Sequence, residues 1–139
     1  MIDVRDLRIG NWVKQCFCNQ IFRVEEIYRN GYIEGEKGEG QCKFDRIEPI
    51  PLTPEILEKC GFKYIEDQRV YRLSIDESDG VEINYSIKKG KIDFEEDSAI
   101  WFISCDPYEG HEFEWVPRSL HELQNAYYFI THEELEVKL

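Results

Sequence analysis

Apolar and polar side chains alternate most regularly in the middle of the chain, over residues 71–76 and again over residues 81–88. A period of two places successive side chains on opposite faces of a strand, so both segments are predicted to be strands with one buried and one wet face. Turn-forming residues lie between them and again at Lys88-Lys89-Gly90-Lys91. The pattern therefore predicts an antiparallel meander, which candidate strands at 92–94 and 100–103 extend.

The first 52 residues show shorter apolar runs separated by turn signals, which is typical of a small β unit. Gly10-Asn11 precedes one expected strand, and further short strands are expected at Phe17, 21–28 and 32–34. Asn30-Gly31 suits a type I′ hairpin turn, because both central residues of that turn need positive φ. Short strands joined by tight turns favour an SH3-like small β-barrel for this unit.

Two helices are predicted from their capping residues. In the first, Thr53 is a suitable N-cap, Pro54 suits the first turn and Gly61 suits the C-terminal stop. The second begins at Ser119, where Glu122 three residues later completes a capping box. Its apolar stripe is expected to pack on the sheet and consists of Leu120, Leu123, Ala126, Tyr127 and Ile130.

These elements predict one α+β domain over residues 1–139, in which the N-terminal SH3-like unit is followed by an antiparallel sheet packed by the C-terminal helix. Two subunits, 1–52 and 53–139, are the alternative division. The segment 134–139 alternates well enough to be a last short strand.

The charge balance narrows the classes of partner. The chain has 29 acidic and 17 basic residues, a formal net charge of -12, and the acids are spread along its length. An aromatic share of 14% is enough for a packed core, so the composition indicates a folded acidic surface and not a disordered acidic tail. A polyanion would be repelled during its approach, so direct DNA or RNA binding is not expected.

The cysteines and the lengths of the apolar runs indicate the cellular compartment in which the protein is expected. Five cysteines at irregular spacing and a charged start at residues 1–6, with no secretory leader, favour a reduced cytoplasm. The longest wholly apolar runs fall far short of the roughly 20 residues that a bilayer span needs. No membrane association is therefore expected.

Two cysteine constellations suggest chemistry, but their patterns count against it. Cys16 and Cys18 could begin a metal site with Cys42, yet structural zinc motifs place two to four residues between their cysteines, and one intervening residue in a strand would turn the two thiols to opposite faces. Cys105 and His111 could form a nucleophile pair, yet an acidic neighbourhood raises the pKa of a thiol. Both sets are interpreted as structural, and no catalytic residue, cofactor or metal is predicted.

Three segments of the chain resemble a known family. They are 6–13 near the start (DLRIGNWV), 48–53 before the first helix, and 120–128 in the second helix (LHELQNAYY), followed by Thr131. In this order they are similar to a family of small uncharacterised proteins encoded in Bacteroidetes genomes, their phages and mobile elements. The family has no assigned activity, so the resemblance implies a phage or mobile-element context and no catalytic residue. Where the family pattern has a glycine after Thr131, this chain has His132-Glu133, so a different helix exit is expected.

The helix face opposite the apolar stripe carries His121, Asn125, Tyr128 and His132. Tyrosine and histidine combine contact area with a polar tip, as interface anchors do, so this face is a candidate interaction surface. The alternative is that it packs on the N-terminal unit. With no chemical motif present, the predicted function is a non-enzymatic protein–protein interaction module with a protein partner. The other functions considered are an acidic DNA mimic or host-defence inhibitor, and a small-ligand binder or enzyme.

Overall fold

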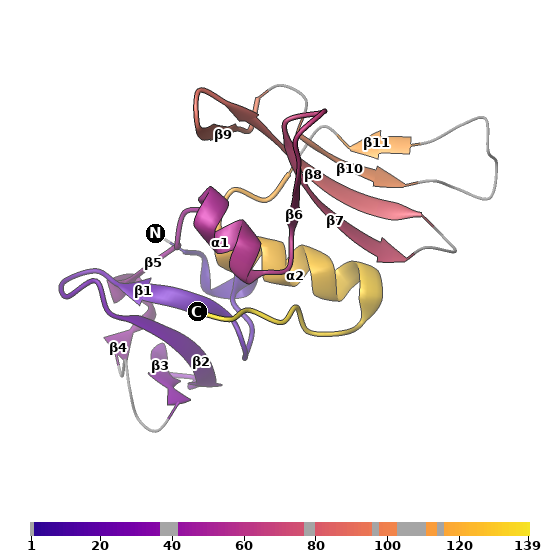
Figure 1. The fold of residues 1–139 in the computed structure, drawn as a ribbon. Coiled ribbons are helices and arrows are strands. Elements are labelled where there is room, and N and C mark those ends of the chain that lie inside the picture. The colour runs from indigo at the N-terminus through magenta and orange to yellow at the C-terminus, as the bar shows by residue number, and fades with distance from the viewer. Residues whose placement is uncertain (1, 37–41, 77–79, 96–97, 103–110, 114–115) are drawn as a thin grey trace. The chain divides into compact units, whose positions relative to one another are not determined.

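The computed structural model describes the chain except residues 1, 37–41, 77–79, 96–97, 103–110 and 114–115 (Figure 1). The chain divides into two compact units, each built from segments that are distant in sequence. Unit 1 comprises Met1–Pro51 and Ser119–Glu134, and unit 2 comprises Leu52–Arg118 and Leu135–Leu139. No helix in the described part of the chain has the length and apolarity that a membrane span needs.

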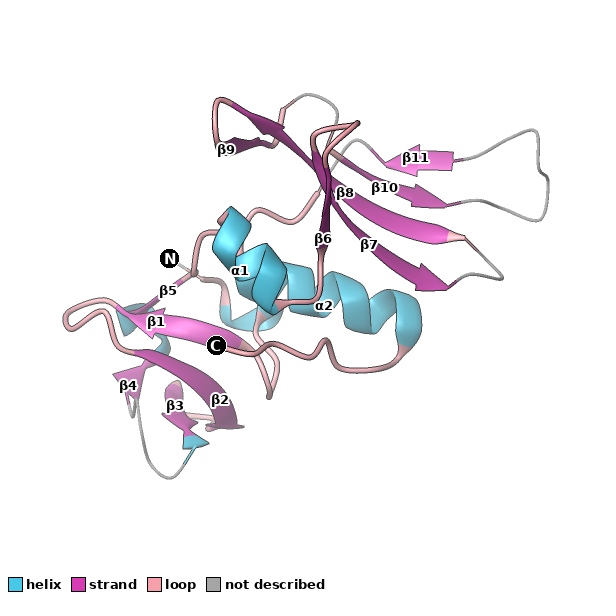
Figure 2. Cartoon of the chain, in the orientation of Figure 1, coloured by secondary structure: helices cyan, strands magenta, loops and turns pink. Residues whose placement is uncertain are grey.

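The described residues of unit 1 form five short antiparallel strands. They are β1 (Trp12–Gln15), β2 (Ile21–Ile27), β3 (Tyr32–Gly35), β4 (Cys42–Lys43) and β5 (Ile47–Glu48), in the sheet order β4-β3-β2-β1-β5. The unit also contains the short 3-10 helices η1 (Val4–Asp6) and η3 (Phe44–Arg46) and helix α2 (Leu120–Thr131) (Figure 2). Among the described residues β4 and β5 end the sheet without pairing to each other, so the expected barrel is not closed.

The core of unit 1 comes from alternate side chains of its strands. Val13, Phe22 and Val24 are at most 2% exposed. They cluster with Ile2, Leu7, Ile33, Cys42 and Ile47. Burial of one large apolar side chain stabilises a fold by about 1.5–3 kcal/mol, so this cluster holds β1, β2 and β3 together.

The type I′ turn predicted at Asn30-Gly31 is wrong, and a type I′ turn occurs instead at Lys89-Gly90, for which no turn type was predicted. Asn30-Gly31 does not form a type I′ turn, because only Gly31 has positive φ, at 87°. The N–H of Tyr28 donates to the carbonyl of Tyr32 at 2.8 Å, which leaves a three-residue loop with Gly31 in the left-handed position. Lys89-Gly90 has φ of 54° and 77°, so it forms the type I′ turn of a two-residue hairpin.

Unit 2 is an antiparallel meander preceded by a short helix. Helix α1 (Pro54–Lys59) leads into β6 (Lys63–Ile65), β7 (Val70–Asp76), β8 (Val81–Lys88), β9 (Lys91–Asp93), β10 (Ala99–Phe102) and β11 (His111–Phe113). The sheet order is β11-β10-β8-β7-β6, with β9 paired to β8. Ile83 and Tyr85 are fully buried, whereas Glu82 and Asn84 on the other face are partly exposed, so the predicted alternation is confirmed.

At the two ends of unit 2, the predicted helix cap is confirmed and the predicted last strand is wrong. The predicted cap of α1 is present, since Thr53 Oγ1 accepts a hydrogen bond from the Ile56 N–H at 3.3 Å. The expected last strand over 134–139 is absent. Leu135 is buried there, and the N–H of Lys138 donates to the carbonyl of Lys59 at 3.0 Å. Burial of Leu135 and this backbone hydrogen bond hold the segment in place of a strand ladder.

Helix α2 starts at Ser119 as predicted, but the capping box is not formed. Ser119 Oγ donates to Glu122 Oε1 at 2.8 Å, so the two side chains bond to each other and not to the backbone. At the other end His132 has φ of 60°, the left-handed position that glycine usually fills, and its N–H donates to the Tyr128 carbonyl at 2.7 Å. The helix exit therefore keeps the ordinary geometry with a histidine in the glycine position.

Helix α2 belongs to unit 1, where it contacts β1, although the sequence assigned it to the sheet of residues 53–139. Leu120 and Leu123 of the predicted stripe are fully buried, but His121 and Gln124 are buried as well. The buried face of the helix is therefore wider than its apolar stripe and includes polar side chains, which need hydrogen-bond partners. The α+β class is confirmed, with mainly antiparallel sheets and one C-terminal helix.

Candidate functional site

Gln124 of helix α2 is hydrogen bonded to the backbone just before and at the start of β1. Its Oε1 accepts from the Trp12 N–H at 2.8 Å, and its Nε2 donates to the Gly10 carbonyl at 2.9 Å. The side chain is only 2% exposed, so both backbone groups are satisfied out of contact with water. The amide thus takes the place of a neighbouring strand at this point of the sheet.

Asn125, the next residue, joins the same N-terminal segment through three further hydrogen bonds. Its Oδ1 accepts from Arg8 Nε and from Asn11 Nδ2, both at 2.9 Å, and its Nδ2 donates to the Asp6 carbonyl at 2.5 Å. Asn11 in turn accepts from the Arg8 N–H at 2.7 Å. One amide therefore fixes the 3-10 turn, the Gly10 turn and the helix against one another.

Arg8 extends this network to the surface. Its guanidinium forms an ion pair with Glu134 at 2.9 Å and lies over the ring of Tyr128, 4.2 Å from the centroid. The Arg8 side chain is 29% exposed and that of Glu134 is 52% exposed, so the ion pair itself adds little stability. Its main effect is to hold the guanidinium over the tyrosine ring.

The predicted stripe of α2 is thereby divided between the interior and the surface. His121 is 4% exposed and its Nδ1 lies 3.1 Å from Ser119 Oγ, and burial lowers the pKa of its imidazole. Asn125 is occupied within unit 1. Tyr128 is 39% exposed, and His132 is exposed with its ring edge-on to Tyr128 at 6.3 Å. Hydrogen bonds to the N-terminal segment thus account for Asn125, and burial beside Ser119 accounts for His121. Tyr128, which Arg8 contacts, and His132 remain accessible.

Exposed large apolar side chains are concentrated on unit 1. Seven of the nine in the described residues belong to it, and the two most exposed are Phe129 of α2 at 82% and Phe17 at 76%. Phe129 directly follows Tyr128 on the helix. We call the group of Arg8, Tyr128, Phe129 and His132 the α2 end surface. The interaction surface predicted from the sequence included neither Phe129 nor Arg8. Phe129 lies outside the apolar stripe of the helix, and this position could have indicated that its side chain is exposed.

The cysteine sets do not assemble into a reactive site among the residues that the structure describes. Cys16, Phe17 and Cys18 form the turn after β1, so the strand expected at Phe17 is wrong. Burial raises the pKa of the Cys16 thiol, and Glu48 raises it further, while burial raises that of Cys42. No group of three metal-ligating side chains is found in the described ranges. Cys105 and the side chain of His111 lie outside the described residues.

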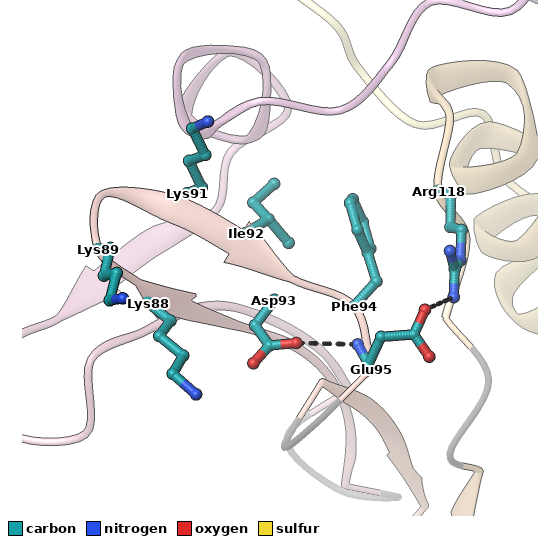
Figure 3. Close-up of a pocket in the computed structure, with 8 residues that line it drawn as sticks. All are labelled: Lys88, Lys89, Lys91, Ile92, Asp93, Phe94, Glu95 and Arg118. Atoms are coloured by element: carbon teal, nitrogen blue, oxygen red, sulfur yellow. Dashed lines mark hydrogen bonds and ion pairs between the residues drawn. The ribbon is translucent and has the colours of Figure 1, made fainter.

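Among the described residues of unit 2, two of the hollows differ in whether their polar groups are paired with one another. One, of about 280 Å³, lies on the wet face of the meander, where Arg72 donates to Asn84 at 2.7 Å and to Gln68 at 2.5 Å. Its polar groups are therefore paired with one another. The other, of about 630 Å³, surrounds the β8–β9 hairpin and is lined by Lys88, Lys89, Lys91, Ile92, Asp93, Phe94, Glu95 and Arg118 (Figure 3).

Comparison with known proteins gave no match to a family model, to a curated protein or to a solved structure.

Proposed function

We propose that the protein is a non-enzymatic protein–protein interaction module whose α2 end surface contacts the partner. The observation that carries the proposal is the 82% exposure of Phe129 beside the partly exposed Tyr128. A phenylalanine left in water forgoes about 1.5–3 kcal/mol of burial free energy, which a partner with an apolar hollow would recover. Aromatic residues and arginine are also the side chains that most often dominate binding energy at interfaces.

The rigidity of this surface supports the same proposal. Tyr128 is held between Arg8 at 4.2 Å and His132 at 6.3 Å, and Arg8 is itself fixed by Asn125 and Glu134. Side chains that are already ordered lose less conformational entropy on binding, so more of the contact energy becomes affinity. The hydrogen bonds and ion pair of Arg8 thus position the exposed Tyr128 for contact with a partner.

The exposed Phe17 provides a matched control for testing this surface. It is 76% exposed and belongs to unit 1, but it lies in the β1–β2 turn. In affinity capture from cells that express the chain, Phe129→Ser is expected to lose the partner and Phe17→Ser to retain it. Equal recovery by both variants and the wild type would reject the α2 end surface as the contact.

The proposal has two further parts, a phage or mobile-element setting and an SH3-like relationship for unit 1, and each is supported by a separate observation. The first is supported by the resemblance of residues 6–13, 48–53 and 120–128. The second is supported by five short antiparallel strands around one small core. Both concern origin and ancestry, and the contact surface does not depend on them.

An acidic mimic of DNA is the second candidate function, favoured by the distribution of charge. Residues 52–118 carry 16 acidic and 8 basic side chains, which is most of the acid excess of the chain. A partner with a basic groove would be drawn to such a field, and its binding would weaken steeply with added salt. Affinity that stays flat between low and moderate salt rejects this candidate and leaves the apolar contact.

A further inference from the structure

The β8–β9 hairpin gathers positive charge in the more acidic part of the chain. Lys88, Lys89 and Lys91 stand within four residues, and Arg118 lines the same hollow. Cross-strand pairing places Lys88 directly opposite Lys91. Like charges opposite each other destabilise an antiparallel pair, so the fold alone gives no reason for this arrangement.

The carboxylates in the hollow do not neutralise these lysines. Asp93 Oδ1 accepts from the Glu95 N–H at 3.0 Å, and Glu95 Oε1 accepts from Arg118 at 2.5 Å (Figure 3). Among the described residues none of the three lysines has an ion pair or a side-chain hydrogen bond, although acids outnumber bases two to one over residues 52–118. The ammonium groups are therefore available to an external anion.

The remaining wall of the hollow is apolar and firmly held. Phe94 packs edge-on against the fully buried Tyr85, with ring centroids 5.9 Å apart, and the Arg118 guanidinium lies 5.6 Å from the Phe94 centroid. The type I′ turn at Lys89-Gly90 fixes the hairpin. Ile92 lies between the turn and Phe94. A flat ring could rest beside these side chains while its charged group reaches the lysines.

We propose that this hollow binds a small organic phosphate of the mononucleotide class. Its volume of about 630 Å³ falls in the usual range of small-molecule sites, roughly 300–1,000 Å³. The phosphate groups supply the negative charge that the ammonium groups would bind, and the ring takes the apolar wall. A nucleic-acid polymer fits less well, because it would extend past the four cations into a surface on which acids prevail.

Isothermal titration of the full chain with AMP and ATP tests the site. The double variant Lys88→Gln, Lys91→Gln is expected to weaken ATP binding by about tenfold or more, since it removes two cations that would form charge-assisted hydrogen bonds with the phosphates. The matched control is Lys59→Gln, Lys63→Gln, which removes the same charge from the same unit outside the hollow and should change affinity less than about twofold. Equal weakening by both pairs would mean a nonspecific charge effect and overturn the site.

Further arms of the same titration separate the ligand classes. Inorganic pyrophosphate that binds as tightly as ATP would overturn the assignment to a ring-bearing ligand. Saturable binding of a mixed-sequence single-stranded DNA without binding of mononucleotides would overturn it in favour of a polymer, and no saturation by either nucleotide at millimolar concentration would overturn it outright. Thermal unfolding of the Lys88→Gln, Lys91→Gln variant checks its fold, and removal of the like-charge pair is expected to leave or raise the midpoint. None of these outcomes bears on partner capture by Phe129.

Discussion

Arg8 Nε donates a hydrogen bond to Oδ1 of Asn125 at 2.9 Å and thereby joins two positions that are 117 residues apart. These residues belong to the first and the last of the three segments on which the family resemblance rests, 6–13 and 120–128. The two motifs are thus the two halves of one polar network. They explain how the chain ends of unit 1 are held together, and they expose Tyr128 beside Phe129.

Removal of the Asn125 amide should destabilise unit 1. Asn125→Ala removes three hydrogen bonds and leaves the Arg8 and Asn11 donors short of an acceptor, so we expect a loss of about 2–3 kcal/mol in the free energy of unfolding. Urea unfolding followed by tryptophan fluorescence measures it. The exposed Asn30→Ala variant, whose Oδ1 accepts one bond from the Tyr32 N–H, should lose less than about 1 kcal/mol. Similar losses for both variants would contradict the network.

Gln124 makes a pH-dependent test possible. Gln124→Glu keeps the shape but removes the donor to the Gly10 carbonyl and buries a carboxyl, whose pKa burial would raise. At pH 7 the variant should be less stable than the wild type by about 2–4 kcal/mol. The difference in the free energy of unfolding between the variant and the wild type should decrease as pH falls through the raised pKa, because the protonated carboxyl donates again and the buried charge is lost. Gln124→Leu has no titrating group, so its difference from the wild type should not decrease in this way.

The left-handed residue at the end of α2 predicts a stabilising substitution. His132→Gly removes the Cβ from a residue at φ of 60° and should raise the free energy of unfolding by up to about 1 kcal/mol, since the strain relieved exceeds the entropy that glycine adds to the unfolded chain. His132→Ala keeps the Cβ and should show no such gain. Equal effects of the two substitutions in thermal unfolding would mean that the backbone conformation is not the cause.

Burial of His121 predicts an acid-sensitive contribution to stability. Because its pKa in the folded protein is lowered, the folded state binds a proton less readily than the unfolded state. The imidazole therefore costs nothing above the unfolded pKa of about 6.5 and destabilises the fold progressively as pH falls below that value. The His121→Gln variant should lose less stability than the wild type between pH 7.5 and 5.5, as measured by urea midpoints. An equal loss of stability by the variant and the wild type over this pH range would contradict the account.

Local patterns in the sequence predicted local structure well, and the rest depended on distant partners. The alternation at 81–88 predicted β8, because a strand's two faces are recorded in consecutive residues. The turn at Asn30-Gly31 was assigned the wrong type, because the pairing of Tyr28 with Tyr32 sets a three-residue loop. Gln124 was not predicted as a core residue, because its partners Gly10 and Trp12 are more than a hundred residues away.

The same limit applied to the candidate site. Helical periodicity placed His121 and Asn125 away from the apolar stripe, and it carried no information on the turn of residues 6–11 that receives Asn125. It did place Tyr128 and His132 on an accessible side. The position of Phe129 outside the apolar stripe was a signal of exposure, but its exposed fraction of 82% depends on the tertiary fold.

Site-specific photo-crosslinking tests the central claim, contact through the α2 end surface, most directly. A photoreactive phenylalanine analogue would replace Phe129 in one variant and Phe17 in another, both in cells that normally express the chain, and crosslinked products would be resolved by mass. We expect a discrete crosslinked protein from position 129 and none of the same mass from position 17, since both side chains are highly exposed and only the first lies on the proposed surface. A crosslinked partner at position 17 alone, or the same product from both positions, would contradict the account.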